Sequence, residues 1–289
     1  MSTAFYRPTD TLEAISLLGR FGKRAIIVNG GTDIVIEISK GRLTPEAIIS
    51  ISDIQELHEI SHQNGYIRIG GSATYYEMME NPLLNHFSGM IEAISQVGSP
   101  AIRQVATLAG NICTAAPAPD GCTMAMGLDA VVVLAGPSGE RLLPLSQMLL
   151  GRGKTAREEH ELLTAILLPI SKKNCAYLRL ARRRAQDIAK VMVGVSLELQ
   201  DGVCKDAVIS LGALNAVPCR AYSLEKLLKN NRIEEGIARV EEIFPQEAKP
   251  RPSPFREYKE QVLPTMIGRT LRKAAERWGT NEPENSILP

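Results

Sequence analysis

Hydrophobic and polar positions alternate most strictly in the last third of the chain. From Val191 to Leu199 every second residue is Val or Leu, and Asp201-Gly202 follows directly. Alternation with period two predicts a β-strand, and Asp-Gly between two such runs is a strong signal for a tight hairpin. The chain is therefore expected to end in an antiparallel sheet backed by helices, with a second strand over 208–213 and helices near 221–229, 233–242 and 256–277.

Shorter patterns alternate between helix and strand in the first half. Asp10-Thr11-Leu12-Glu13 has the form of a capping box ahead of an apolar helical stretch. Strands at 24–28 and 47–51 flank a helix-bearing segment and predict a small βαβ-like unit, and Tyr66 to Gly70 begins a second unit. The further elements expected are helices near 75–80 and 82–96 and strands near 129–135 and 162–168.

These patterns predict an α+β chain with more than one core. A chain of 289 residues is long enough for two or three small cores. We expect a first domain over 1–172, with subdomains of about 1–56 and 57–172, and a C-terminal α+β domain over 173–279. Residues 280–289 are expected to form a polar tail.

The apolar run Ile26-Ile27-Val28 ends in Asn29-Gly30-Gly31-Thr32-Asp33. Glycine takes positive φ at little cost, so such a turn can point several main-chain N–H groups at one anion. A diphosphate needs short donors with no bulky Cβ between chain and ligand. The spacing matches neither of the two commonest nucleotide-binding glycine motifs. A plain turn is the alternative reading.

A second unusual segment runs from Gly98 to Asp120. It is rich in Ala, Gly and Pro, with scattered Thr, Asn and Asp and few large apolar residues. Such a segment buries little surface by itself, whereas its hydroxyls and amides suit the lining of a polar ligand. The alternative is a connection of small residues packed tightly against a sheet.

These two segments, in this order, resemble the FAD-binding subunits of the molybdenum hydroxylases, which include xanthine, nicotinate and carbon monoxide dehydrogenases. The first is similar to the family's Gly-Gly-Thr-Asp diphosphate loop. The second is similar to its Ile-Arg-Asn-x-x-Thr-x-Gly-Gly-Asn stretch and the Pro-x-x-Asp that follows. Arg182 to Ala189 resembles the family's basic pair followed by Asp-Ile-Ala, and the likeness extends to Phe255-Arg256-Glu257-Tyr258.

The resemblance implies a two-part FAD-binding domain of the vanillyl-alcohol-oxidase / p-cresol methylhydroxylase type. It implies that the first loop wraps the FAD diphosphate, with Gly30, Gly31 and Thr32 closest, and that the second segment serves the other side of the diphosphate and the ribityl chain. The implied cofactor-binding residues are Ile27, Val28, Asn29, Gly30, Gly31, Thr32, Asp33, Ile34, Thr107, Leu108, Ala109, Gly110, Asn111 and Thr114.

Four further residues are placed at the cofactor by the resemblance alone. Asp120 would accept hydrogen bonds from ribityl or ribose hydroxyls, since both carboxylate oxygens accept. Val97 would lie against the flavin ring, and Leu163 and Arg179 would approach the adenine end. No residue is assigned a catalytic or metal-binding role.

The chain departs from the family pattern at three positions. Ala109 stands where glycine is usual, so we expect an allowed φ there or a slightly displaced loop, because a methyl group at positive φ costs about 1–2 kcal/mol. Gln104 replaces an asparagine and lengthens the amide arm. Asn29 precedes the glycine pair where Gly or Ala is common, and Asn tolerates left-handed geometry.

Composition narrows the classes of partner. The net charge is +1 and aromatic residues make up 4% of the chain, so neither nucleic acid nor a membrane surface is expected. No apolar run is long enough to span a bilayer, and the first residues lack the form of a secretion signal. Five cysteines without Cys-x-x-Cys spacing predict neither disulfides nor an iron–sulfur cluster on this chain. A cytoplasmic location is expected.

Other chemistry-bearing residues have ordinary explanations. Of Arg182, Arg183 and Arg184 at a strand end, at most two can share one side, and Arg183 could face solvent or the site. His58 and His62 have the spacing of a helical metal pair, but their surroundings favour a surface loop. Cys113 is expected to fill space.

The function implied is electron transfer within a heteromeric oxidoreductase. FAD on this chain would receive electrons from [2Fe-2S] clusters of a small partner subunit and pass them to NAD⁺ or another acceptor. A large partner subunit would hold molybdopterin and oxidise a purine or another N-heterocycle. The alternatives are a self-contained flavin reductase or oxidase of the same fold, a non-redox scaffold subunit, and a nucleotide-sugar binding module.

Overall fold

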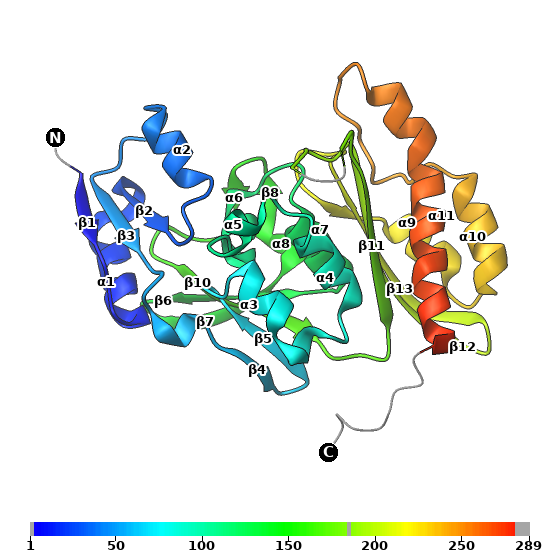
Figure 1. The fold of residues 1–289 in the computed structure, drawn as a ribbon, viewed down its shortest axis with the longest axis horizontal. Helices are drawn as coiled ribbons and strands as arrows, with labels where there is room; N and C mark the ends of the chain where they lie inside the picture. The colour runs from blue at the N-terminus through cyan, green and yellow to red at the C-terminus, as the bar shows by residue number, and fades with distance from the viewer. Residues whose placement is uncertain (1–2, 184–185, 281–289) are drawn as a thin grey trace. The chain divides into compact units, whose positions relative to one another are not determined.

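The computed structural model describes residues 3–183 and 186–280, and Figure 1 shows the fold. The chain divides into two compact units, each built from separate segments. The first comprises Met1–Leu84, Ile94–Ala116 and Asp129–Ile170, and the second comprises Asn85–Ala93, Pro117–Leu128 and Ser171–Pro289. The contiguous domain boundaries expected from the sequence stay a prediction. Arg184 and the tail from residue 281 onward lie outside the described residues.

The first unit begins with a small parallel sheet in the order β1-β3-β2. Asp10 caps the helix that packs on it by accepting a hydrogen bond from the Glu13 N–H at 2.8 Å, while the Glu13 carboxylate reaches the Thr9 N–H. Only half of the predicted capping box therefore forms. The elements are β1 (Ala4–Tyr6), α1 (Thr11–Phe21), a 3₁₀ turn η1 (Gly22–Arg24), β2 (Ala25–Val28), α2 (Ile34–Ser39) and β3 (Ala47–Ser50).

A five-stranded antiparallel sheet in the order β4-β5-β10-β6-β7 forms the rest of the first unit. Its strands are β4 (Ile60–Gln63), β5 (Tyr66–Gly70), β6 (Val131–Gly136), β7 (Gly139–Pro144) and β10 (Leu162–Pro169). The strands and the helix expected at 66–70, 75–80, 129–135 and 162–168 are confirmed. The remaining elements are η2 (Gln55–Leu57), α3 (Tyr75–Glu80), η3 (Pro82–Leu84), α5 (Pro100–Arg103), α6 (Leu108–Thr114), α8 (Leu145–Met148), β8 (Leu149–Gly151) and β9 (Lys154–Thr155).

The single helix expected over 82–96 is wrong. The structure has the 3₁₀ turn η3 and a separate helix α4 (Ser88–Ile94). The Asn81 side-chain oxygen accepts a hydrogen bond from the Leu83 N–H at 3.0 Å, and Pro82 has no N–H to donate. A local side-chain acceptor and a proline together favour a turn over a continuous helix.

The second unit contains an antiparallel sheet in the order β11-β12-β13-β14, which confirms the sheet expected at the C-terminal end. Its hairpin turns through Asp201 (φ 53°) and Gly202 (φ 74°), both left-handed, as a type I′ turn requires. The elements are β11 (Asn174–Leu180), β12 (Val191–Gln200), β13 (Val203–Gly212), β14 (Cys219–Arg220), α7 (Asp120–Gly127), α9 (Tyr222–Leu228), α10 (Ile233–Glu241) and α11 (Arg256–Thr280).

Helices cover both faces of this sheet. The face that carries Val191, Val193 and Val195 packs against the residues of α9, α10 and α11 in one large core. On the opposite face, a Cβ on Gly194 would lie 2.7 Å from Ser210 Oγ and 3.1 Å from Met124 Sδ, so α7 lies directly on a surface of small residues. No described helix of either unit is long and apolar enough to cross a membrane.

Candidate functional site

The first glycine loop leaves the end of β2 and turns sharply into α2. Gly31 has φ 69°, the left-handed region that favours glycine. Gly30 is required for a different reason, because a Cβ at that position would lie 1.8 Å from the Val105 carbonyl oxygen. The loop therefore lies directly against the main chain of the second segment, within the first unit.

The second segment is organised by the start of α6. Thr107 is the N-cap residue of this helix, and its Oγ1 accepts a hydrogen bond from the Gly110 N–H at 3.0 Å. The Thr107 side chain is buried, so its hydroxyl fixes the helix entry. Just before it, the Ala106 carbonyl accepts from the Tyr75 N–H at 2.9 Å, which ties the segment to α3.

Side-chain hydrogen bonds join the two segments. Asn29 Nδ2 donates to the Gly71 carbonyl at 2.9 Å and to Thr107 Oγ1 at 3.5 Å. At the other end of α6, Thr114 Oγ1 donates to the Gly110 carbonyl at 2.8 Å and lies 3.5 Å from Asp33 Oδ2. The two glycine-bearing segments that the sequence singled out are thus in contact at both ends.

Main-chain donors gather where the segments meet. Among the described residues, none accepts a hydrogen bond from the N–H groups of Gly30 to Asp33 or from that of Ala109 in the first turn of α6. Glycines that keep Cβ atoms out of the turn and several such N–H groups form the chemistry that receives a phosphate oxygen. These residues fit the diphosphate of FAD without a lysine.

Two of the residues placed by resemblance also belong to the first unit. The Val97 carbonyl accepts a hydrogen bond from Arg103 Nη1 at 3.0 Å, which fixes the turn before α5. The Leu163 side chain is buried in β10, and a Cβ on Gly71 would lie 2.5 Å from the Leu163 carbonyl oxygen. The Leu163 main chain thus lies close to Gly71, whose carbonyl accepts the hydrogen bond from Asn29. Gly71 was not predicted as part of the site, although its place after Gly70 at the end of a strand was a usable signal.

Asp120 and Arg179 belong to the second unit and bind each other. Asp120 Oδ1 accepts from Arg179 Nη1 at 3.2 Å and from the Tyr177 hydroxyl at 2.8 Å. Burial raises the pKa of the Asp120 carboxyl, and the Arg179 charge and the Tyr177 hydrogen bond oppose that rise. Tyr177 was not predicted as part of this group, because no motif distinguishes it from a core aromatic residue.

The departures from the family pattern fit the structure at low cost. Ala109 lies in the first turn of α6 and is not among the described residues with positive φ, so its methyl group meets no backbone strain. Gln104 is the C-cap residue of α5. The left-handed non-glycine residue of this segment is Ala115, with φ 44°, at the end of α6.

The remaining candidates lie in other settings. Arg182 and Arg183 are exposed in a loop after β11, where the Asp187 carboxylate accepts from both of their N–H groups. Hydrogen bonding to Arg182 lowers the pKa of Asp187. The two ring nitrogens of His58 face Glu77 and the Ser52 carbonyl, which gives it a structural role. Cys113 is exposed on α6, so the expectation that it fills space is wrong.

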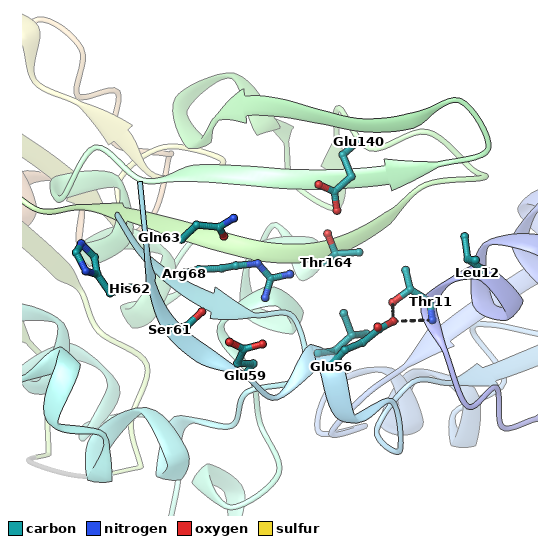
Figure 2. Close-up of a pocket in the computed structure, with 11 residues that line it drawn as sticks. Thr11, Leu12, Glu56, Glu59, Ser61, His62, Gln63, Arg68, Glu140 and Thr164 are labelled. Atoms are coloured by element: carbon teal, nitrogen blue, oxygen red, sulfur yellow. Dashed lines mark hydrogen bonds between the residues drawn. The ribbon is translucent and has the colours of Figure 1, made fainter. Parts of the chain in front are cut away.

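A cavity of about 590 Å³ opens elsewhere on the first unit (Figure 2). It shares no residue with the glycine-bearing segments. Glu56 at its edge accepts a hydrogen bond from the Thr11 N–H at 3.0 Å. Its lining is mainly polar and comprises Thr11, Leu12, Glu56, Leu57, Glu59, Ser61, His62, Gln63, Arg68, Glu140 and Thr164.

The two-unit α+β fold agrees with comparisons to known families, which show a FAD-binding domain followed by a C-terminal domain. A family model of the FAD binding domain in molybdopterin dehydrogenase matches residues 1–171, and one of the CO dehydrogenase flavoprotein C-terminal domain matches residues 176–274. The chain belongs to the family of FAD-binding subunits of molybdopterin dehydrogenases, and it is an oxidoreductase subunit.

The chain is similar to known relatives over most of their length. The chain is 32% identical to the nicotinate dehydrogenase FAD-subunit of Eubacterium barkeri, with 78% of each chain covered. It is 27% identical to the xanthine dehydrogenase FAD-binding subunit of Escherichia coli O157:H7, covering 96% of this chain and 97% of the relative. A solved structure of reconstituted CO dehydrogenase from Oligotropha carboxidovorans superposes with a TM-score of 0.88 at 26% identity, covering 96% of this chain and 99% of that one.

Proposed function

We propose that this chain is the electron-transfer subunit of a molybdenum hydroxylase of the xanthine dehydrogenase type. In this role it holds the FAD through which electrons pass from iron–sulfur clusters on a small partner subunit to NAD⁺ or another acceptor. A large partner subunit carries the molybdopterin and oxidises the organic substrate. The hard chemistry belongs to the cofactors, and this chain supplies binding, orientation and electrostatics.

The observation that carries the proposal is the contact between the Gly30 loop and the start of α6. The N–H groups of residues 30–33 and 109 hold the two phosphates, and the absence of a Cβ at Gly30 lets the loop lie directly on the Val105 main chain. Asn29 keeps the two segments in register through Gly71 and Thr107. The Thr114 hydroxyl and the Asn111 amide are proposed to bind the ribityl side.

The assignments away from the diphosphate rest on the family resemblance. Val97 is proposed to meet the flavin ring and Leu163 the adenine end. Asp120 is proposed as an acceptor of ribityl or ribose hydroxyls and Arg179 as a second contact of the adenine end. The Asp120–Arg179 ion pair gives these two residues a structural role in addition.

For the substrate we propose a purine or another N-heterocycle. Two of the relatives are named for nicotinate and xanthine, which are both nitrogen heterocycles. A net charge of +1 and few aromatic residues support small-molecule and protein partners over nucleic acid or membrane. All five cysteines are free, which suits a reducing, cytoplasmic compartment.

Substitution of Gly31 by Val tests the assignment of the loop. Gly31→Val places a branched side chain at φ 69° beside the N–H groups that receive phosphate, so the purified protein should lose its flavin absorbance. Gly41→Val is the control for backbone strain, because Gly41 has φ 67° and open space around it, whereas a Cβ on Gly31 would also lie 3.0 Å from Val35 Cγ2. Both variants carry similar backbone strain, and Gly41→Val should keep its flavin.

Normal flavin occupancy in Gly31→Val would remove the loop from the FAD site. Turnover tests the wider role: the isolated chain should oxidise NADH with artificial acceptors but should not oxidise xanthine or nicotinate. Substrate oxidation by the chain alone would contradict a subunit role and favour a self-contained flavin enzyme.

A further inference from the structure

Lys259 on α11 is a buried cation that pairs with no carboxylate of the residues that the structure describes. The residue is 9% exposed, and its Nζ donates to the carbonyl of Ala213 at 2.6 Å. Other cations of the second unit that are largely buried pair with acids: Arg179 with Asp120, Arg220 with Glu225 and Arg277 with Glu92. A buried ammonium group held by one neutral carbonyl is costly, because it has lost its water and gained no opposite charge.

Two more cations lie beside Lys259. The main-chain N–H of Arg251 donates to the carbonyl of Leu214, which adjoins Ala213, at 3.3 Å, so Arg251 follows the chain segment that holds the Lys259 ammonium. The Lys190 ammonium lies 4.0 Å from the centre of the Phe255 ring, and the Phe255 carbonyl accepts from the Lys259 N–H one helical turn away. Burial lowers the pKa of Lys259, and the charges of Arg251 and Lys190 lower it further.

None of these three side chains pairs with a carboxylate among the described residues. Three like charges brought together repel one another, so the arrangement reduces the stability of the folded chain unless an anion joins it. Lys259 is buried at the base of the group, Lys190 is half-buried and Arg251 is exposed, so the group can be reached from solvent.

We propose that Lys259, Lys190 and Arg251, all of the second unit, form a binding site for a phosphate-type oxyanion, and this site shares no residue with the glycine-bearing segments. Two ammonium groups and a planar guanidinium supply many charged donors, which suits an anion with several oxygens and more than one negative charge. The source is either inorganic phosphate or the phosphate of a soluble nucleotide such as NAD⁺.

The test uses the full chain with FAD bound, and inorganic phosphate as the probe. Thermal unfolding and calorimetric titration are followed at constant ionic strength, with chloride replacing phosphate in the reference. Phosphate should raise the unfolding temperature saturably. Arg251→Gln and Lys190→Gln should each weaken phosphate binding about tenfold, the loss expected for one charge-assisted contact. Lys226→Gln, an exposed lysine of α9, removes the same charge and should change nothing.

A second measurement separates a ligand site from a merely structural cluster. In chloride, Arg251→Gln should unfold at the same temperature as the wild type or higher, since a repelling charge has been removed. No specific response to phosphate, or an undiminished response in both variants, would overturn the proposal. Loss of flavin absorbance in these variants would also overturn it, because the cations would then serve FAD itself. Displacement of phosphate by NAD⁺ would support the site and identify a dinucleotide as its ligand. Binding of phosphate without competition from NAD⁺ would also support the site and identify the free anion as its ligand.

Discussion

Gly30 lies against the main chain of Val105 so closely that no side chain fits between them. A Cβ on Gly30 would be 1.8 Å from the Val105 carbonyl oxygen and 2.4 Å from its carbonyl carbon. Since Gly30 is not among the described residues with positive φ, this glycine is required by space and not by backbone conformation. The contact fixes the first glycine loop against the segment that leads into α6.

Gly30→Ala should therefore damage the fold and the cofactor site together. The added methyl group must push the two segments apart, and overpacking of this kind costs about 1–3 kcal/mol in unfolding free energy. Flavin affinity should fall as well, because the donors of the two segments no longer converge. Urea unfolding and flavin absorbance measure the two effects.

The control is Gly19→Ala, a helical glycine of α1 with nothing within 4 Å of its added Cβ. This variant should gain up to about 1 kcal/mol of stability and keep its flavin. A Gly30→Ala protein as stable and as yellow as the wild type would show that the contact is unimportant.

Asn29 is expected to need its amide and not merely its size. In Asn29→Asp a carboxylate would face the Gly71 carbonyl oxygen, to which the Asn29 amide donates a hydrogen bond at 2.9 Å in the wild type. The carboxylate would also lie beside the phosphate groups of the proposed FAD site. Flavin titration should show weaker binding for Asn29→Asp than for Asn29→Ala, which only removes the bond. The opposite order would place Asn29 away from the phosphates.

Much of this site could be predicted because glycine and small polar residues leave a clear signal. The strand β2 and the glycine pair that follows it are local features, and the sequence indicated both, whereas the helix α6 that Thr107 caps was not predicted. The contacts between these elements could not be predicted from the sequence. Nothing in the sequence couples Gly30 to Val105 or Asn29 to Gly71, because pairing across long separations depends on the whole fold.

The strand β12 shows the same limit. Its alternation predicted one apolar face correctly, but it did not indicate that the face with Gly194 and Ser196 is covered as well. In the structure that face is buried beneath α7, and a side chain on Gly194 would collide with Ser210 and Met124. Small residues at a close approach and polar residues at a surface look alike in a sequence.

Asp120 and Arg179 should behave as a coupled pair. Their side chains are 10% and 4% exposed, so Asp120→Asn leaves a buried guanidinium without its carboxylate and should cost about 3–5 kcal/mol. The double variant Asp120→Asn with Arg179→Met should recover part of that loss. A double-mutant cycle by urea unfolding measures the coupling, and purely additive effects would rule out the pair as a stabilising unit.

Flavin content measured on the same proteins separates the two roles of Asp120. If Asp120 also binds ribityl or ribose hydroxyls, flavin loss in Asp120→Asn should persist in the double variant even where stability recovers. Recovery of flavin together with stability would restrict Asp120 to its structural contact with Arg179 and Tyr177.

Glu161 should control part of the acid sensitivity of the first unit. Arg141 donates to it twice, at 2.5 and 2.8 Å, and this hydrogen bonding lowers the pKa of the Glu161 carboxyl below its ordinary value of 4.5. A carboxyl with a lowered folded pKa stabilises the protein above its unfolded pKa, and that stability is lost as the pH falls through the folded pKa. Glu161→Gln should therefore be less stable than the wild type by about 1–3 kcal/mol at pH 7, and the two curves should converge below about pH 4.

Urea midpoints measured across this range check the prediction, with Glu46→Gln as the control. Glu46 and Arg24 form an ion pair with side chains 43% and 57% exposed, so breaking it should change the stability by less than about 1 kcal/mol throughout. Because Glu161 also accepts from the Glu158 N–H at 2.7 Å, the pair fixes the turn before β10 as well as joining it to β7. If the stability curves of wild type and Glu161→Gln stay parallel down to pH 3, the ionised carboxylate adds no stability to the contact between β7 and the turn before β10.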